Sequence, residues 1–385
     1  MKKDWTYKKL REVGTVITGS TPSTKDNMNY SSQDVCFFKP SDLSSDSLVK
    51  LSKSEFYISK HAFEHSRKLP KGSVLTTCIG IIGKVGILTE EATCNQQINA
   101  IIPNPDIIIS DFLGYSIMSK KHILQASANA PVVPLLNKTQ FSEFSIPIPP
   151  LSIQRSIVAE LDLLHSVISK KKEQLRELDN LAQSLFYQMF GDPITNPMGW
   201  EIKKLGEVAE TTSGGTPSKS NNEYYENGTI PWLRSGEVSQ GFIYNTELFI
   251  TQKGLDNSSA KMIPVDSVAI AMYGATVGEV GIIKSPMCTN QAICSILPNK
   301  YLVPIYLRYF LMAMKPKYIA VAAGGAQPNI SQAIIRNTHL PLPPLSLQQS
   351  FAAKVSAIEA QKQAITQSIQ HTEALLAQRM DQYFG

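Results

Sequence analysis

Two sets of polar side chains in this 385-residue sequence are suited to reading the edges of nucleic-acid bases. Arginine and lysine pair with guanine acceptors, and aspartate or glutamate accepts from the cytosine amino group. We expect the loops Thr18–Lys25, Lys39–Asp42, Thr212–Lys219 and Arg234–Glu237 to face DNA, with residues 322–329 as a weaker candidate. The candidate residues are Thr18, Ser20, Thr21, Lys25, Lys39, Ser41, Asp42, Ser213, Thr216, Ser218, Lys219, Trp232, Arg234, Ser235, Glu237, Gln327 and Asn329. Ordinary hydrogen bonding within a loop is the alternative role for any one of them.

The motifs of nucleotide, metal and acyl-transfer chemistry are absent. The segment Gly80–Val85 comes nearest to a phosphate-binding loop, but its spacing is wrong and no hydroxyl follows Lys84. The sequence also lacks GxGxxG, HExxH, GxSxG and the Asn-Pro-Pro-aromatic tetrapeptide of amino-methyltransferases. The six histidines are scattered and the cysteines show no CxxC spacing. We therefore predict no catalytic residues, no cofactor and no metal.

Amide side chains accompany each loop set, at Asn95-Gln96 and at Asn290-Gln291. An amide can pair with adenine or can hold a turn, so both roles stay open. The segments Val35–Leu43 and Ile230–Val238 each begin with an apolar, strand-like run. A basic and then an acidic residue follow the run, as at the polar tip of a strand. Glycines over 80–86 and 274–281 indicate tight turns between short strands.

A duplication organises these elements. The segment from Ile146 to Gly191 recurs from Leu340 to Gly385, 194 positions later, and each copy opens with a proline-rich run. Proline lacks the amide donor and its ring clashes with the preceding turn, so each helix must begin after the prolines. A helix from Leu151 to Met189 would be about 57 Å long, which is a length suited to a spacer.

Apolar residues follow a heptad spacing along both copies, which indicates a seam that buries against a partner helix. The seam residues are Ile157, Leu161, Leu164, Ile168, Leu175 and Leu178 in the first copy, and Val355, Ile358, Ile365, Ile369 and Leu376 in the second. Lys171 interrupts the first seam. Each seam could pack on its own globular domain, but two copies that each follow a domain favour pairing with one another.

Repeat and domain coincide, and each domain has mixed helical and strand patterns. We predict an α+β chain with two similar mixed α/β domains and two long helices that form an antiparallel coiled coil. The predicted boundaries are 1–150 for the first domain, 151–191 for the first helix, 192–199 for a linker, 200–344 for the second domain and 345–385 for the second helix.

Composition sets wider bounds. The net charge is +5 and only 18% of residues are charged, so binding to a polyanion must rely on local basic patches. Five cysteines without a framework spacing suit a reducing cytoplasm. No apolar run approaches the length of a membrane span, and the first residues do not resemble a signal peptide. We expect a soluble cytoplasmic protein.

These features together resemble the specificity subunit of type I restriction-modification systems. The resemblance covers the whole chain and rests on four features: the openings Ile146–Gln154 and Leu340–Gln348, the helices that end in Phe-Gly, the Leu205-Gly206-Glu207-Val208 start, and the Gly274–Gly281 turn with Asn290-Gln291. It implies two target recognition domains that each read half of a split DNA sequence, and helices that set the gap and dock two methylase subunits.

The resemblance also implies that the chain itself has no catalytic activity. Adenine methylation and ATP-driven translocation with cleavage would belong to partner modification and restriction subunits. The two domains differ, with Phe37 in place of Trp232 and Pro40-Ser41 in place of Ser235-Gly236, so we predict an asymmetric bipartite target. Two alternatives remain: an enzyme subunit with its own active site, and a two-domain scaffold that binds proteins.

Overall fold

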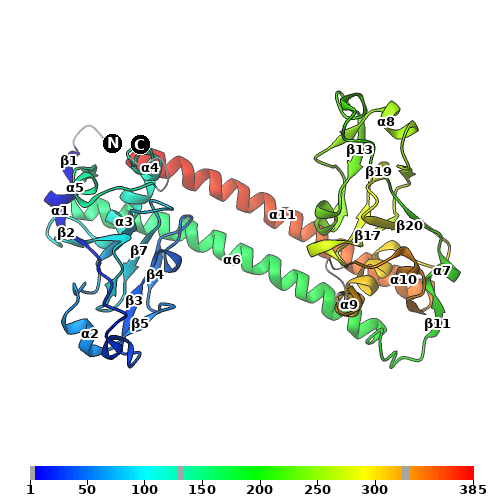
Figure 1. Ribbon diagram of the computed structural model, residues 1–385, viewed down its shortest axis with the longest axis horizontal. Coiled ribbons are helices and arrows are strands. Elements are labelled where there is room, and N and C mark those ends of the chain that lie inside the picture. The colour runs from blue at the N-terminus through cyan, green and yellow to red at the C-terminus, as the bar shows by residue number, and fades with distance from the viewer. Residues whose placement is uncertain (1–4, 129–133, 323–328) are drawn as a thin grey trace. The chain divides into compact units, whose positions relative to one another are not determined.

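The computed structural model describes residues 5–128, 134–322 and 329–385, and the chain divides into two compact units. Unit 1 comprises Met1–Glu173 and Thr366–Gly385, and unit 2 comprises Gln174–Ile365. Each unit therefore contains one domain and a segment of each of the two long helices, α6 (Leu151–Phe190) and α11 (Leu345–Phe384) (Figure 1).

Unit 1 is built on two sheets of short strands rich in β-branched residues, which suit a pleated, buried surface. Over its described residues, a five-stranded sheet has the order β2 (Gly14–Thr18), β9 (Ile98–Pro103), β6 (Val74–Thr77), β7 (Val85–Leu88) and β4 (Val49–Leu51). A three-stranded sheet has the order β5 (Tyr57–Ile58), β3 (Val35–Phe38) and β8 (Thr93–Cys94). A separate pair joins β1 (Thr6–Lys9) to β10 (Ser145–Ile148).

Unit 2 repeats this topology, with the short strand β16 added to its smaller sheet. Over its described residues, the larger sheet has the order β12 (Thr211–Ser213), β20 (Ile293–Ile296), β17 (Val268–Ala271), β18 (Val280–Ile283) and β14 (Phe242–Ile243). The smaller sheet has the order β15 (Phe249–Ile250), β13 (Ile230–Leu233), β19 (Met287–Thr289) and β16 (Met262–Ile263). The pair of β11 (Glu201–Lys204) with β21 (His339–Leu342) corresponds to that of β1 with β10.

Helices cover one face of each larger sheet. In unit 1, α3 (Ser110–Ser119) lies against β7 and is followed by α4 (Lys121–Ala126). In unit 2, α9 (Pro304–Ala322) lies against β18. Shorter helices complete the domains: α1 (Leu10–Val13), α2 (Lys60–Glu64) and α5 (Lys138–Ser142) in unit 1, and α7 (Leu205–Val208), α8 (Gln252–Asp256) and α10 (Gln332–Arg336) in unit 2.

A buried glutamine fixes the start of each long helix to its domain. The side chain of Gln154 accepts from the backbone N–H of Ile109 (3.0 Å) and donates to the carbonyl oxygens of Ile107 and Pro149 (both 2.9 Å). Gln348 makes the corresponding three bonds in unit 2, at 2.9 to 3.1 Å. A buried amide must satisfy its donors and acceptor, so this clamp determines where α6 and α11 leave their domains.

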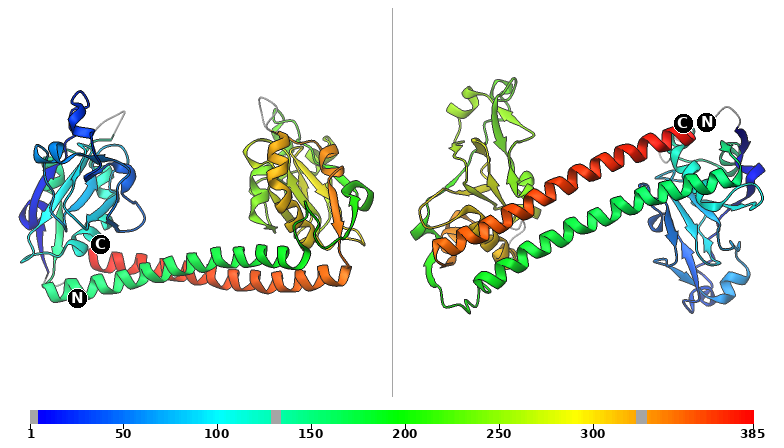
Figure 2. Two further views of the ribbon diagram at one scale, coloured as in Figure 1. Left: turned by 90° about the horizontal axis from the view of Figure 1, so that it is seen from below. Right: turned by 180° about the vertical axis from the view of Figure 1, so that it is seen from behind.

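The two long helices pack against each other within unit 1, where Figure 2 shows the start of α6 beside the end of α11. Glu160 accepts from the hydroxyl of Tyr383 (2.5 Å) and pairs with Arg379 (2.8 Å). Further along, Lys171 donates to the hydroxyl of Ser368. Residue numbers rise on one helix as they fall on the other, so the segments are antiparallel, and the lysine that interrupts the seam has a partner.

The same antiparallel pairing holds within unit 2. Lys362 lies 2.7 Å from Asp179 and 3.1 Å from Glu359. Burial alone lowers the pKa of Lys362, but these two hydrogen-bonded carboxylates outweigh it and raise the pKa overall. Phe190 packs on Tyr306 and Phe351, with ring centroids 4.8 and 5.3 Å apart. The predicted α+β fold with two similar domains and an antiparallel helix pair is confirmed.

The heptad residues lie on the packed face of each helix. Ile157, Leu161, Ile168, Val355, Ile358 and Ile369 are buried, and Leu164, Leu175, Leu178, Ile365 and Leu376 are half-buried. The helix ends go beyond the seam, because Phe384 joins the core of unit 1 and Phe190 joins the core of unit 2. Each domain core is thus completed by the helix that follows the other domain in the sequence.

Candidate nucleic-acid interface

Loops from distant parts of unit 1 meet at one edge of its sheets. The N–H of Ser20 donates to the carbonyl of Cys94 (2.9 Å), that of Asn95 to Phe38 (3.0 Å), and that of Cys78 to Gln97 (2.8 Å). These bonds join the ends of β2, β3 and β6 to the turn before β9. We name residues 18–25, 39–42, 78–84 and 95–97 the strand-end face of unit 1.

Unit 2 has the corresponding edge. The N–H of Gly215 donates to Thr289 (2.9 Å), that of Asn290 to Leu233 (2.9 Å), and that of Met272 to Ala292 (2.8 Å). The strand-end face of unit 2 comprises residues 213–219, 234–237, 272–278 and 290–292. The loops predicted to face DNA thus come together with the amide pairs within each unit.

Glycine allows the loops 18–25 and 213–219 to approach their neighbouring turns closely. These turns carry Asn95-Gln96 and Asn290-Gln291, and we call them the amide turns. A Cβ atom at Gly19 would overlap the carbonyl oxygen of Asn95, and one at Gly214 would overlap that of Thr289. Any larger residue must push the loop away from the turn.

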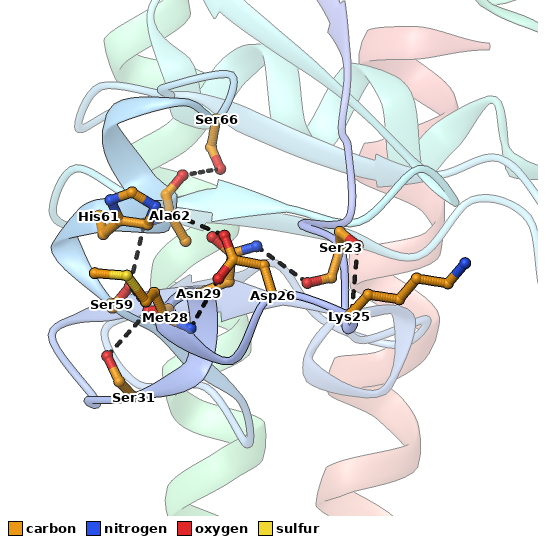
Figure 3. A network of polar contacts seen from close by, with 10 residues as sticks. All are labelled: Ser23, Lys25, Asp26, Met28, Asn29, Ser31, Ser59, His61, Ala62 and Ser66. Carbon is orange, nitrogen blue, oxygen red and sulfur yellow. Dashed lines mark hydrogen bonds and ion pairs between the residues drawn. The ribbon is translucent and has the colours of Figure 1, made fainter.

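Polar contacts hold the loop of unit 1 and leave its lysine outside (Figure 3). Asp26 accepts from the N–H of Met28 (3.0 Å), and the amide of Asn29 donates to the carbonyl of Ser23 (3.0 Å). The hydroxyl of Ser59, at the start of α2, donates to the carbonyl of Met28 (2.6 Å). Figure 3 shows the Lys25 side chain extending away from this network. An exposed ammonium on an anchored loop is suited to contact an anion.

The acidic residues at both tips are occupied by backbone amides. Asp42 accepts from the N–H of Lys39 (2.7 Å) and of Glu55 (3.0 Å). Glu237 accepts from the N–H of Arg234 (3.1 Å) and of Glu247 (2.8 Å), and is only 6% exposed. Such bonds satisfy the first turn of a helix. These carboxylates hold the tips in shape, and the base contact expected of them from the sequence stays a prediction.

The basic residues at the tips have different surroundings in the two units. The ammonium of Lys39 lies 3.0 Å from the centre of the Phe56 ring, which is a cation–π arrangement. The guanidinium of Arg234 pairs instead with Glu247, and its Nε lies 3.6 Å from Glu237. Both basic side chains are partly exposed. The two faces share a frame but present unlike groups at the same position.

Trp232 supports its loop from inside. It is 3% exposed, and its indole N–H donates to the carbonyl of Gly215 (3.0 Å). Phe37, its counterpart in unit 1, is also buried and cannot make that bond. This bond and its burial place Trp232 behind residues 213–219, where it positions that loop. The direct contact of Trp232 with DNA stays a prediction.

The remaining predicted residues are placed as follows. Thr18 donates to Asn99 (2.7 Å), Ser213 to Gln332 (3.2 Å) and Ser41 to Glu55 (3.5 Å). Ser20 and Ser235 are half-buried, whereas Ser218 and Lys219 are exposed. Asn329 is exposed and pairs with Tyr273 in an isolated bridge, and Gln327 lies outside the described residues.

The predicted sites did not include the hairpin tips. Ile81 is 63% exposed between Gly80 and Gly83, which both have positive φ. The corresponding turn of unit 2 presents Tyr273, which is 45% exposed, beside Gly274. The glycines predicted a turn in each domain. The different residues beside these glycines, Ile81 and Tyr273, were the sequence signal that could have included the turns in the candidate site.

Among residues 5–128, 134–322 and 329–385, no group of His, Cys, Asp and Glu side chains is placed to hold a metal ion. No helix within these ranges is long and apolar enough to cross a membrane. A groove of about 780 Å³ is lined by residues of α7, the end of β20 and Arg336, away from the strand-end face.

Comparisons with known proteins also find two similar halves in this chain. The family model of the type I restriction modification DNA specificity domain matches twice, at residues 2–180 and 197–373. The MjaIX type I restriction enzyme specificity subunit of Methanocaldococcus jannaschii is 28% identical, over 92% of this chain and 87% of its own length.

Two solved structures share the fold. A chain from work on complex assembly and conformational transition of the type I R-M system has a TM-score of 0.64 at 21% identity, covering 99% of this chain and 97% of its own. The S subunit of a type I restriction-modification system from M. genitalium has a TM-score of 0.58 at 13% identity, covering 99% and 96%. Since the family model spans most of the sequence in two copies, the chain belongs to the type I restriction-modification DNA specificity family.

Proposed function

We propose that this chain is the subunit that selects the DNA target of a type I restriction-modification complex, and that each domain reads one half of an asymmetric bipartite sequence. One observation carries the proposal: two strand-end faces with the same frame present different groups, Lys39 over Phe56 in one and Arg234 beside Glu247 in the other. The shared backbone arrangement of the two faces suits the duplex geometry that both half-sites have. The different side chains at the tips suit recognition of different bases.

The proposed contacts are the exposed and partly exposed members of the two faces. In unit 1 these are Ser20, Thr21, Lys25, Lys39 and Ser41, and in unit 2 they are Thr216, Ser218, Lys219, Arg234, Ser235 and, beyond the loop, Asn329. Thr18, Asp42, Ser213, Trp232 and Glu237 support these loops through the hydrogen bonds described above. The domain boundaries at 150, 191, 199 and 344 remain part of this proposal.

The long helices set the gap between the half-sites in this proposal, and they dock two methylase subunits. Support for the spacer role comes from the two 40-residue helices, α6 and α11, which pair along their heptad seams within each unit. Methylation and cleavage belong to the modification and restriction subunits of the complex, and the chain contributes no catalytic residue or cofactor. The five free cysteines and the proposed DNA target support a cytoplasmic location for the complex.

The experiment expresses the chain with its methylase subunits in a host that lacks other adenine methylases, and maps methylated adenines across the genome. The expected result is one motif with two unlike half-sites and a fixed gap. A host with the methylase subunits alone is the control, and it should show no motif. A palindromic motif would contradict the assignment of unlike domains to unlike half-sites, and the absence of any motif would contradict the proposed function.

A further inference from the structure

An exposed glutamine occupies the same place in both strand-end faces. Gln96 and Gln291 each follow the asparagine of the amide turn. The hydroxyl of Thr21 donates to Oε1 of Gln96, and the hydroxyl of Thr216 donates to Oε1 of Gln291, across the same separation of 75 residues. The two domains have therefore kept one side-chain pair in one geometry, although the basic tips beside it differ.

Hydrogen bonds fix the backbone that carries each partner of the Thr–Gln pair. Asn95 accepts from the N–H of Gln97 (3.1 Å) and Asn290 from that of Ala292 (3.2 Å), which fixes the turn that presents each glutamine. On the other side, the hydroxyl of Tyr30 donates to Pro22 (2.8 Å) and that of Tyr225 to Pro217 (2.5 Å). These bonds fix the loop immediately after each threonine.

The threonine bond orients the amide group. Because Oε1 faces the threonine hydroxyl, the Nε2 group with its two N–H donors points away from the loop. Among the described residues, no acceptor is found for the N–H groups of Nε2 in either glutamine. Ordering a long exposed side chain costs rotamer freedom, and an exposed hydrogen bond returns little stability. The ordering has a physical benefit if the two free N–H donors bind an acceptor on a ligand, because the amide is then already oriented for that bond.

We propose that Gln96 and Gln291 donate to phosphate oxygens of the DNA backbone, as one sequence-independent anchor for each half-site. The inference rests on the proposed function, and the reason for phosphate is the repetition itself. A contact that is chemically the same in two domains cannot distinguish unlike half-sites, so it falls on what the half-sites share. Glutamine amides are common donors to phosphate, and such contacts set the register of a protein on the duplex.

The test measures binding of the full chain, with its methylase subunits, to a duplex that carries the mapped target and to one with scrambled half-sites. Gln96→Met and Gln291→Met keep the length of the side chain and remove the donors. Each is expected to raise Kd about tenfold on both duplexes, with the ratio between them unchanged. Thr21→Val and Thr216→Val release the amide and are expected to have smaller effects in the same direction.

A matched control and a second measurement keep the test specific. Gln33→Met removes an exposed amide before the start of β3, at the opposite end of that strand from the strand-end face, and should leave Kd unchanged. Methylphosphonate substitution, which removes one phosphate charge at a time, should find one position per half-site where wild type loses affinity and the methionine variant loses no more.

Each outcome decides one question. A changed base preference in Gln96→Met or Gln291→Met, or a Kd equal to that of Gln33→Met, would overturn the phosphate anchor. Methylphosphonate positions that penalise the variant as strongly as wild type would overturn it as well. A wild-type complex that binds both duplexes equally would instead overturn the proposed function.

Discussion

The end of α11 is the perturbation that tests the fold most directly. Phe384 is 0% exposed and packs on Phe112 with ring centroids 5.2 Å apart, in the core of unit 1. Replacing a fully buried phenylalanine by alanine costs about 3–5 kcal/mol, of which the ring pair contributes about 1 kcal/mol. Since about 1.4 kcal/mol corresponds to tenfold in an opening equilibrium, Phe384→Ala should raise opening of the unit 1 core by about two to four orders of magnitude.

Hydrogen exchange resolves this effect unit by unit. In Phe384→Ala, amides of β6 and β9 should exchange faster, whereas those of β17 and β20 should keep their protection. Leu375→Ala is the control, because this residue is also apolar and on α11 but is exposed. Phe190→Ala should give the reverse result, since Phe190 lies in the core of unit 2. Equal acceleration in both units, or none in unit 1, would refute the packing of each helix end into the core described here.

Three further predictions concern the site, the helices and the thiols. Arg234→Ala should relax base preference in one half-site only, by about 1–3 kcal/mol, and methylation mapping that shows equal loss in both halves would contradict this. Removing one heptad from each helix, about Leu175 and Ile365, keeps the seams in phase, shortens each helix by about 10.5 Å and should shorten the recognised gap by about three base pairs. An unchanged gap in the mapped motif would exclude the spacer role. At about pH 8, dithionitrobenzoate should react first with the half-buried Cys36, because burial raises the pKa of Cys78, Cys94 and Cys294 to about 12 and of Cys288 to about 11. Rapid reaction of several thiols in the folded chain would show that these cores are open.

Local pattern was enough for much of the fold. The proline runs set the starts of both long helices, because proline does not fit inside a helix and each helix must therefore begin after its run. The heptad spacing identified the faces that pack, since a repeat of 3.5 residues keeps one side of a helix toward its partner. The recurrence of the helix segment after 194 residues indicated two similar domains. These properties depend on residues near one another in the chain, so the sequence alone contained them.

The roles of individual polar residues were not determined by local pattern. Asp42, Glu237 and Trp232 have side chains that could bind DNA or support a loop, and only their burial and hydrogen bonds distinguish the two roles. The glutamines of the helix openings were part of the repeat motif, but their clamp on the loops at 107–109 and 301–303 depends on residues about 45 positions away. Whether a polar group is buried is a property of the packed domain.

The sequence by itself determined that the chain is duplicated, that each copy ends in a long helix with a packed face, and that no familiar catalytic motif is present. Tertiary structure decided what the ends of those helices pack against, because Phe384 completes the core that contains Phe112, and Phe190 completes the core that contains Tyr306. It also decided that Thr21 meets Gln96 and Thr216 meets Gln291. Such contacts join residues about 75 to 270 positions apart, so they form only when distant parts of the chain fold together. Hydrophobic burial stabilises the aromatic contacts among them.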